Sequence, residues 1–377
     1  MYIKQANLKM LEKLVVPGKV VVIYGARQTG KTTLIKHYMS SVDENILFVS
    51  GEDMTVKESL ESQSLEKLRS FVGKHSLLVI DEAQHVKKIG LNLKLLVDHL
   101  PHLKIIATGS SSFELAKDVG EPLTGRSYVL RMYPLAQMEI MTTENPHEVK
   151  PHLDDRLIYG SYPEVVVFQD NSMRQRHLST MVNSYLFKDI LVLDDIRHAD
   201  KLQRLLQLLA FQIGREVSHN ELAVQLSMSK NTVARYLDLL EKVFVIYRRT
   251  GFSRNLRKEL SKSNRYYFFD NGIRNALINN FNPLSLRDDV GLLWENYVMS
   301  ERLKRHDYKG EYVSSWFWRT YDQKEIDLVE ESSGQLCGYE MKWNPRKMVK
   351  APKDWTTHYP SATFETIHPG NYLPFIL

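Results

Sequence analysis

A run of eight residues bracketed by glycines, Gly25-Ala-Arg-Gln-Thr-Gly-Lys31-Thr32, has the spacing that cradles a chain of phosphates. The glycines let the backbone curl so that successive N–H groups face one anion. In such a loop the lysine reaches the β- and γ-phosphates, and the threonine hydroxyl ligates Mg²⁺. We therefore predict ATP and Mg²⁺ as ligands, and a nucleotide-binding stretch made of Gly25, Ala26, Arg27, Gln28, Thr29, Gly30, Lys31, Thr32 and Thr33.

Two adjacent acids supply the second half of this predicted site. Asp81 and Glu82 follow the apolar run 77–80, about fifty residues after the glycine-bracketed loop. Acids at the carboxyl end of a buried parallel strand lie where open α/β sheets bind ligands. We expect Asp81 to hold Mg²⁺, directly or through water, and Glu82 to orient the attacking water as a general base. The pair predicts hydrolysis of the nucleotide and not binding alone.

Two further residues are candidates for assisting hydrolysis. Thr108 ends another apolar strand and would place a hydroxyl beside the γ-phosphate as a sensor, with Ser110 as its rival. Arg126 could deliver a guanidinium to the nucleotide of a neighbouring subunit. A structural ion pair is the alternative role for Arg126.

A second constellation lies near the C-terminus. Glu295 falls in a helix-like stretch, Asp327 in a strand-like one, and Glu340 and Lys342 in a later strand. Because side chains alternate along a strand, Glu340 and Lys342 share one face, where Asp327 could join them. The predicted metal ligands Glu295, Asp327 and Glu340 would suit Mg²⁺ or Mn²⁺, and Lys342 would steady the attacking water or the phosphoryl transition state.

The middle of the chain is basic and helical. Between residues 201 and 262 there are twelve Lys and Arg against five Asp and Glu, a surplus larger than the net charge of +5 of the whole chain. Two short helices around a turn at 227–229, followed by two strands, predict a winged helix-turn-helix. Such a module can contact DNA or pack against protein. Its predicted DNA contacts are Lys230, Asn231, Thr232, Arg235, Arg254, Arg257 and Lys258.

The elements that must position these residues alternate along the first 135 residues. Short β-branched runs at 20–24, 46–50, 77–80, 104–107 and 128–131 alternate with helical patterns, which predicts a parallel sheet covered by helices. We expect an α/β fold with four parts: a P-loop NTPase core at 1–135, a helical lid at 136–200, the winged helix at 201–272 and an α/β domain at 273–377.

Composition sets the broad class. The 377 residues suit two or three domains, and 43% hydrophobic and 25% charged residues are ordinary for soluble proteins. No apolar stretch approaches the length of a membrane span, so we expect a cytoplasmic protein without a membrane partner. The single cysteine, Cys337, excludes a disulfide framework within the chain and any multi-cysteine zinc site.

Taken together, several motifs resemble one family, the bacterial and archaeal AAA-type ATPases with a C-terminal domain of unknown function. They are the loop 25–33, Asp81-Glu-Ala-Gln84, 108–112, Leu123-Thr-Gly-Arg126, Gly160-Ser-Tyr-Pro-Glu164 and Tyr266-Tyr-Phe-Phe-Asp-Asn-Gly272. The resemblance implies an ATPase core, a winged helix, a nuclease-like end and switching by homo-oligomerisation. The C-terminal set resembles PD-(D/E)XK nucleases, with Ile326 in place of their proline.

These features predict an ATPase whose nucleotide state controls a DNA-binding winged helix and a metal-dependent nuclease-like domain. The alternative is a non-cleaving switch in which ATP drives oligomerisation or partner docking.

Overall fold

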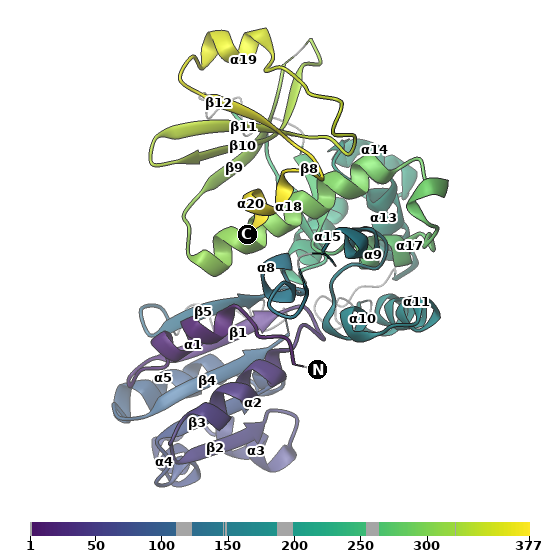
Figure 1. Ribbon diagram of the computed structural model, residues 1–377. Helices are drawn as coiled ribbons and strands as arrows, with labels where there is room; N and C mark the ends of the chain where they lie inside the picture. Colours follow the sequence, from purple (N-terminus) through teal and green to yellow (C-terminus); the bar gives the residue numbers. More distant parts are fainter. Residues whose placement is uncertain are drawn as a thin grey trace.

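The protein, seen here as a computed structural model, has a parallel sheet at one end, a smaller mixed sheet at the other and helices between them (Figure 1). The structure describes residues 2–110, 123–145, 147, 149–186, 199–253, 264–320 and 322–377. None of the helices within these ranges is both long and apolar enough to cross a bilayer.

The N-terminal sheet has five parallel strands in the order β2-β3-β4-β1-β5. Its central strands are β-branched and buried on both faces, as the apolar runs in the sequence predict. The parallel α/β architecture is thus confirmed. The strands are β1 (Val20–Gly25), β2 (Ile46–Ser50), β3 (Leu77–Asp81), β4 (Lys104–Gly109) and β5 (Ser127–Met132).

Helices cover both faces of this sheet. One face packs with Leu8, Leu11 and Leu34, while the other packs with Leu68, Leu93 and Leu96. The two layers hold the strands in register, so that their carboxyl ends form one rigid edge. The helices are α1 (Asn7–Leu14), α2 (Lys31–Ser41), α3 (Met54–Leu60), α4 (Leu65–Val72), η1 (Ala83–His85) and α5 (Ile89–His99).

A set of helices follows the sheet and leads to the middle of the molecule. It comprises α8 (Gln137–Ile140), α9 (Val149–Tyr159), α10 (Pro163–Val167), α11 (Asn171–Thr180), η2 (Met181–Leu186) and, later in the chain, α17 (Asn271–Leu277). The turn between α9 and α10 touches the start of α17. A Cβ on Gly160 would lie 2.1 Å from Asp270 Oδ1, and one on Gly272 would lie 2.0 Å from the Tyr159 carbonyl oxygen. Two motifs about 110 residues apart therefore meet at a contact that admits only glycine.

The middle module contains three helices and a small antiparallel sheet in the order β6-β8-β7. Ser218 and Ser229 each cap the helix that follows, accepting hydrogen bonds from Glu221 N–H (3.3 Å) and Thr232 N–H (3.0 Å). Its elements are α13 (Ala199–Phe211), β6 (Glu216–Val217), α14 (His219–Gln225), α15 (Lys230–Lys242), β7 (Ile246–Arg249) and β8 (Asn264–Phe268).

The C-terminal part is a helix followed by a four-stranded sheet in the order β12-β11-β10-β9, in which only β11 and β12 are parallel. The buried rings of Trp318 and Trp355 pack one face of the sheet. The elements are η3 (Leu284–Leu286), α18 (Val290–Lys309), β9 (Ser314–Arg319), β10 (Glu325–Ser332), β11 (Gln335–Met341), α19 (Lys353–His358), β12 (Thr363–Ile367) and α20 (Tyr372–Ile376).

Helix α18 joins the two ends of the molecule. Glu301 on this helix accepts a hydrogen bond from Gln137 N–H at the start of α8 (2.6 Å), and the Tyr297 hydroxyl donates to Gln137 Oε1 (3.0 Å). All three groups are buried, so the contact is costly to break. The C-terminal part is thereby fastened to the segment that leaves the N-terminal sheet.

One buried ion network holds α18 against β10. The carboxylate of Glu330 accepts from Arg302 (2.7 Å) and lies 2.8 Å from His306 Nε2. Although burial opposes it, the hydrogen bonds from His306 and Arg302 lower the pKa of Glu330 to about 2. A depressed carboxyl pKa contributes stability that is present above its unfolded value near 4.5 and is lost as the pH falls toward 2.

Glu330→Gln is therefore expected to lower the free energy of unfolding by about 3 kcal/mol at pH 7, because Arg302 loses its buried partner. The loss should shrink between pH 4.5 and pH 2. Urea denaturation at pH 7 and pH 3 checks this, with Glu331→Gln as the neighbouring control. An equal loss at both pH values would contradict the ion network.

Candidate functional site

The glycine-bracketed loop wraps around the amine of Lys31 at the start of α2. Lys31 Nζ donates to the carbonyl oxygens of Gly25 and Ala26, both at 2.9 Å, and its side chain is buried. Gly30 has φ +93°, a left-handed conformation that frees the loop to enter the helix. The loop thus holds a cation at the N-terminus of an 11-residue helix, an arrangement suited to phosphate.

Two close contacts fix the loop in place. A Cβ on Gly25 would lie 1.9 Å from the Met132 carbonyl oxygen at the end of β5, so only glycine fits there. On the other side, Gln5 Nε2 donates to the carbonyl oxygens of Thr29 and Gly30, both at 3.3 Å. The N-terminal segment therefore clamps the loop, a role for Gln5 that no motif in the sequence indicates.

The predicted metal ligands of the loop and of β3 lie side by side. Thr32 Oγ1 donates to Asp81 Oδ2 at 2.9 Å, and Thr108 Oγ1 donates to the other oxygen of Asp81. The backbone N–H of Glu82 donates in turn to Thr108 Oγ1 (3.1 Å). A hydroxyl and a carboxylate at this spacing are oxygen donors of the kind Mg²⁺ takes, so the residues present fit the ion.

Glu82 is held by a residue to which the sequence assigned no role. Its backbone is left-handed (φ +53°), and its carboxylate accepts a hydrogen bond from Gln84 Nε2. Gln84 Oε1 accepts in turn from Ser110 N–H at 3.3 Å. The side chain of Gln84 therefore ties the predicted base to the end of β4, beside both candidate sensors.

Arg126 lies at the opposite edge of the sheet. Its carbonyl oxygen accepts from Val20 N–H at the start of β1, whereas the phosphate-type loop follows the end of β1. The guanidinium pairs with Asp98 at 2.6 Å. Arg126 therefore cannot reach the loop of its own chain, and a role in a neighbouring subunit stays a prediction.

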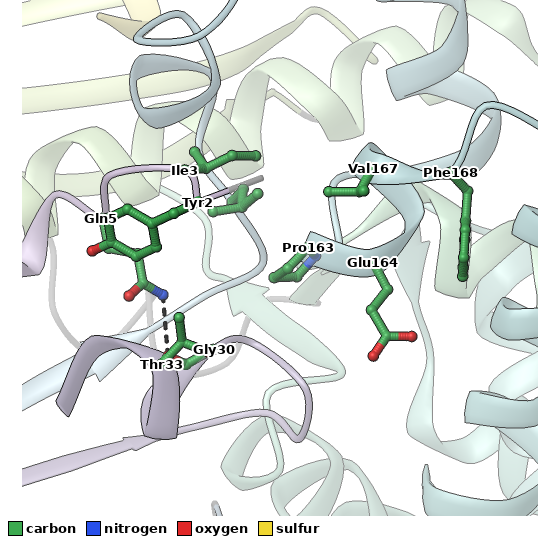
Figure 2. A pocket seen from close by; sticks show the side chains of 10 residues that line it. Tyr2, Ile3, Gln5, Gly30, Thr33, Pro163, Glu164, Val167 and Phe168 are labelled. Atoms are coloured by element: carbon green, nitrogen blue, oxygen red, sulfur yellow. Dashed lines mark hydrogen bonds between the residues drawn. The ribbon is translucent and has the colours of Figure 1, made fainter. Parts of the chain in front are cut away.

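A pocket of about 280 Å³ opens beside the loop (Figure 2). Tyr2 and Ile3 line it from the N-terminal segment, Thr33 from α2, and Pro163 and Val167 from α10. The Tyr2 ring also stacks on His37, with the centroids 4.4 Å apart. The pocket is mainly apolar and continues from the point where the loop meets α2.

The four predicted residues of the C-terminal constellation come together between α18, β10 and β11. Asp327 Oδ2 accepts from Met341 N–H (2.9 Å), and Lys342 Nζ donates to Glu340 Oε1 (2.6 Å). Glu295 Oε1 accepts from the Tyr267 hydroxyl (2.7 Å). Glu340 Oε2 is buried and has no hydrogen-bond partner within the described part of the chain.

The carboxyl groups of this cluster affect one another electrostatically. Burial, reinforced by the charge of Asp327, raises the pKa of Glu295 to about 8 and that of Glu340 to about 7. Burial likewise raises the pKa of Asp327. For Lys342 burial acts to lower the pKa, but the hydrogen bond to Glu340 and the surrounding acids raise it. Crowded, desolvated carboxyls of this kind are typical of functional sites.

Two neighbours were not predicted from the sequence. The guanidinium of Arg265 lies 3.8 Å from Asp327 and 2.6 Å from Glu325, and Tyr267 holds Glu295. Both come from β8 of the middle module. Within the described ranges, no three or more Asp, Glu, His or Cys side chains are grouped as ligands for one ion. The predicted set of three metal ligands, Glu295, Asp327 and Glu340, is therefore not found grouped around one ion among these residues. Glu295 instead accepts a hydrogen bond from Tyr267, which leaves Asp327 and Glu340 as a pair of carboxylates.

The predicted DNA contacts lie partly on an exposed helix end. Lys230, Asn231 and Arg235 are exposed and Thr232 is half-buried at the N-terminal end of α15, while Val233, Tyr236 and Leu240 face the core. Arg254, Arg257 and Lys258 lie outside the described residues.

Three family models match successive parts of the chain. Residues 17–141 match a family described as an AAA domain. Residues 150–284 and 290–368 match two domains of unknown function, DUF8612 and DUF4143. The N-terminal part, with its parallel sheet and phosphate-type loop, is therefore an AAA-type ATPase-like domain.

Similar proteins are known from distant organisms. An uncharacterized protein of Mycobacterium tuberculosis is 27% identical over 86% of this chain and 70% of its own. One of Haemophilus influenzae is 28% identical over 84% and 80%, respectively. Among solved structures, the Walker-type ATPase of Pyrococcus abyssi covers 74% of this chain and 96% of its own, with 15% identity and a TM-score of 0.49.

Proposed function

We propose that the protein is an ATPase whose nucleotide state controls a DNA-binding winged helix and a metal-dependent nuclease-like domain. The observation that carries the ATPase part is the contact of Thr32, Asp81 and Thr108 at the carboxyl edge of the sheet, with Glu82 beside them. Lys31 and the loop N–H groups would bind the phosphates, and Thr32 and Asp81 would hold Mg²⁺. The ion would neutralise charge on the phosphates during hydrolysis.

The pocket beside the loop supports ATP as the nucleotide. Its walls adjoin Thr33, the last residue of the nucleotide-binding stretch, and its lining is mainly apolar. A purine and its ribose suit such a space, with Tyr2 and Pro163 against the ring (Figure 2). Because the walls come from both the N-terminal segment and α10, nucleotide binding would draw these two segments together.

The middle module supports DNA as a partner. Its helices α14 and α15 and the sheet β6-β8-β7 have the element order of a winged helix-turn-helix. Exposed Lys230, Asn231 and Arg235 lie at the N-terminal end of α15, the end that enters the major groove in helix-turn-helix proteins. Phosphate contacts of this kind should make DNA affinity fall steeply with salt.

The C-terminal cluster supports a metal-dependent phosphodiesterase. Among the described residues, the buried Glu340 Oε2 has no hydrogen-bond partner, and burial, reinforced by crowding with Asp327, raises the pKa of Glu340 to about 7. A divalent cation would relieve that crowding, so Asp327 and Glu340 fit Mg²⁺ or Mn²⁺ as ligands. The ion would supply Lewis-acid charge to a phosphodiester, while Lys342 holds the attacking water or the developing negative charge.

A chain of aromatic rings supports communication between the two sites. Tyr24, next to Gly25 of the loop, contacts Phe244 (5.7 Å between centroids), and Phe244 contacts Phe269 (5.5 Å). Phe269 contacts Tyr247 (5.0 Å), and Tyr247 stacks on Tyr267 (5.6 Å), whose hydroxyl holds Glu295. A movement of β1, which carries Tyr24 and leads into the loop, would be transmitted to Glu295 through these packed side chains.

The proposal is tested by measuring phosphate release and strand scission together. Purified protein is incubated with Mg²⁺ or Mn²⁺, linear and supercoiled DNA, and ATP, ADP or no nucleotide. ATP hydrolysis together with nucleotide-dependent cleavage supports the proposal. If the protein hydrolyses ATP but neither its DNA affinity nor its DNA cleavage changes with the bound nucleotide, the proposed control of DNA by ATP is wrong.

Phe244→Ala isolates the communication step. Phe244 has φ +57°, a strained value for a bulky residue, and its ring touches both Tyr24 and Phe269. We expect the variant to bind ATP normally but to lose most of the ATP-dependent change in DNA affinity. Phe281→Ala, which removes a ring stacked on Tyr159 away from this chain, controls for lost packing. Equal losses in both variants would argue against the aromatic route.

The position of Arg265 beside Asp327 favours a second candidate function, one without DNA cleavage. Its buried guanidinium already neutralises part of the charge on Asp327, a role that a metal ion would otherwise fill. The alternative is a non-cleaving switch that oligomerises or docks a partner when ATP binds. Light scattering with and without ATP distinguishes the two: a nucleotide-dependent mass without any strand scission favours the switch.

A further inference from the structure

A second cavity, of about 450 Å³, lies where three parts of the chain meet. Arg131 and Tyr133 line it from the end of the N-terminal sheet, Tyr247 and Arg249 from β7, and Asp307 from α18. It is separate from both sites described above. The chemistry of those two sites does not use the cavity itself, although Phe244, Tyr247 and Phe269 of its lining also belong to the aromatic chain between them.

One wall of this cavity is aromatic. Tyr133 stacks on Phe269, with the ring planes 22° apart and the centroids 5.4 Å apart. Phe244 and Tyr247 flank the same Phe269 ring at 5.5 and 5.0 Å. Rings from three segments thus line one side of the cavity, and a planar aromatic molecule would pack against their accessible edges.

The four acids that line the described part of the cavity, Asp238, Glu241, Asp307 and Glu311, each lie beside a basic side chain. Asp307 pairs with Arg131 (3.3 Å), Asp238 pairs with Lys242 (2.7 Å), and Glu311 lies 2.7 Å from His306. Arg249 has no carboxylate within ion-pair distance in the part of the chain that the structure describes. Its guanidinium lies over the ring of Tyr247, 5.3 Å from the centroid.

Two buried polar atoms at this position have no hydrogen-bond partner among the residues that the structure describes. They are Arg249 Nε and the hydroxyl of Tyr247, a residue that is only 6% exposed. Unsatisfied buried donors cost free energy, and a charged one costs more than a neutral one. An anionic group beside Arg249 would accept from both residues and also neutralise the guanidinium.

We propose that this cavity binds a small planar aromatic anion, with its ring on the wall of Tyr133, Phe244 and Phe269 and its acidic group at Arg249 and Tyr247. The inference does not depend on ATP hydrolysis or on DNA cleavage. Bound there, the ligand would touch the end of the N-terminal sheet, the middle module and α18 at once.

The test uses 1-anilinonaphthalene-8-sulfonate, a fluorescent aromatic anion, titrated into the full chain. We expect saturable binding at one site that weakens about tenfold or more in Arg249→Gln, because a charge-assisted hydrogen bond is lost. The matched control, Arg248→Gln, changes the neighbouring arginine, which points to the other face of β7 and should leave the affinity within about twofold.

A second variant guards against local unfolding of β7. Val313→Trp fills the cavity from a different segment and should also remove the site, while thermal unfolding reports whether each variant keeps its fold. If adenosine monophosphate displaces the dye and indole-3-acetate does not, the acidic group of the ligand is a phosphate. If only indole-3-acetate displaces the dye, the acidic group is a carboxylate. Equal dye binding by the parent and Arg249→Gln, or no saturable binding by the parent, would overturn the proposal.

Discussion

Replacing Glu82 with Gln is expected to leave ATP binding intact and to slow hydrolysis about 10²- to 10⁴-fold, the range typical of a lost general base. The amide keeps the size of the side chain but cannot take a proton from water. Thr32 and Asp81, which touch each other and not the Glu82 side chain, would still hold Mg²⁺. Single-turnover phosphate release and equilibrium binding of labelled ATP separate the two effects.

The matched control is Glu52→Gln, which alters an exposed carboxylate near the same edge of the sheet. A Gln84→Ala variant tests the position of the base separately, because Gln84 donates a hydrogen bond to the Glu82 carboxylate. We expect Gln84→Ala to change the hydrolysis rate but not ATP affinity. If Glu82→Gln hydrolyses ATP as fast as the parent, the base must be another group and the assignment of this site is wrong.

The sequence predicts the N-terminal sheet well, because short runs of neighbouring residues determine its strands. The central strands of the N-terminal sheet are continuous apolar runs such as 20–24 and 77–80, and burial on both faces leaves such runs little alternative. The loop and the acids follow these strands directly, so their meeting at one edge follows from parallel pairing alone. Thr32 and Asp81 are indeed in contact.

What the sequence does not predict depends on pairing between distant segments. Tyr267 reaches Glu295 and Arg265 reaches Asp327 only because β8 packs against both α18 and β10, and no local pattern encodes that contact. Gln5 likewise acts on a loop some 25 residues away. The contact of Gly160 with Asp270 has a sequence signal, since both lie in motifs of the family resemblance, but the motifs do not say that they touch.

Lys342→Ala is expected to reduce metal-dependent DNA cleavage by about 10²-fold or more, as loss of an electrostatic stabiliser of the transition state does. The amine lies 2.6 Å from Glu340 and, together with the guanidinium of Arg265, partly offsets the charge of three crowded carboxyls. Without it, Glu340 should bind a proton more readily, because Asp327 and Glu295 remain close. ATP hydrolysis should not change, since the cluster shares no residue with the nucleotide site.

Strand scission of plasmid DNA in Mg²⁺ and in Mn²⁺, measured beside phosphate release, checks this expectation. Lys347→Ala, which removes an exposed lysine in the loop that follows, is the matched control, and Asp327→Asn tests the metal ligand independently. Cleavage that survives in both Lys342→Ala and Asp327→Asn would place the scissile chemistry elsewhere. If the intact protein cleaves no DNA in any nucleotide state, the cluster is structural, and the crowded carboxyls then serve to hold β8, α18 and β10 together through Tyr267 and Arg265.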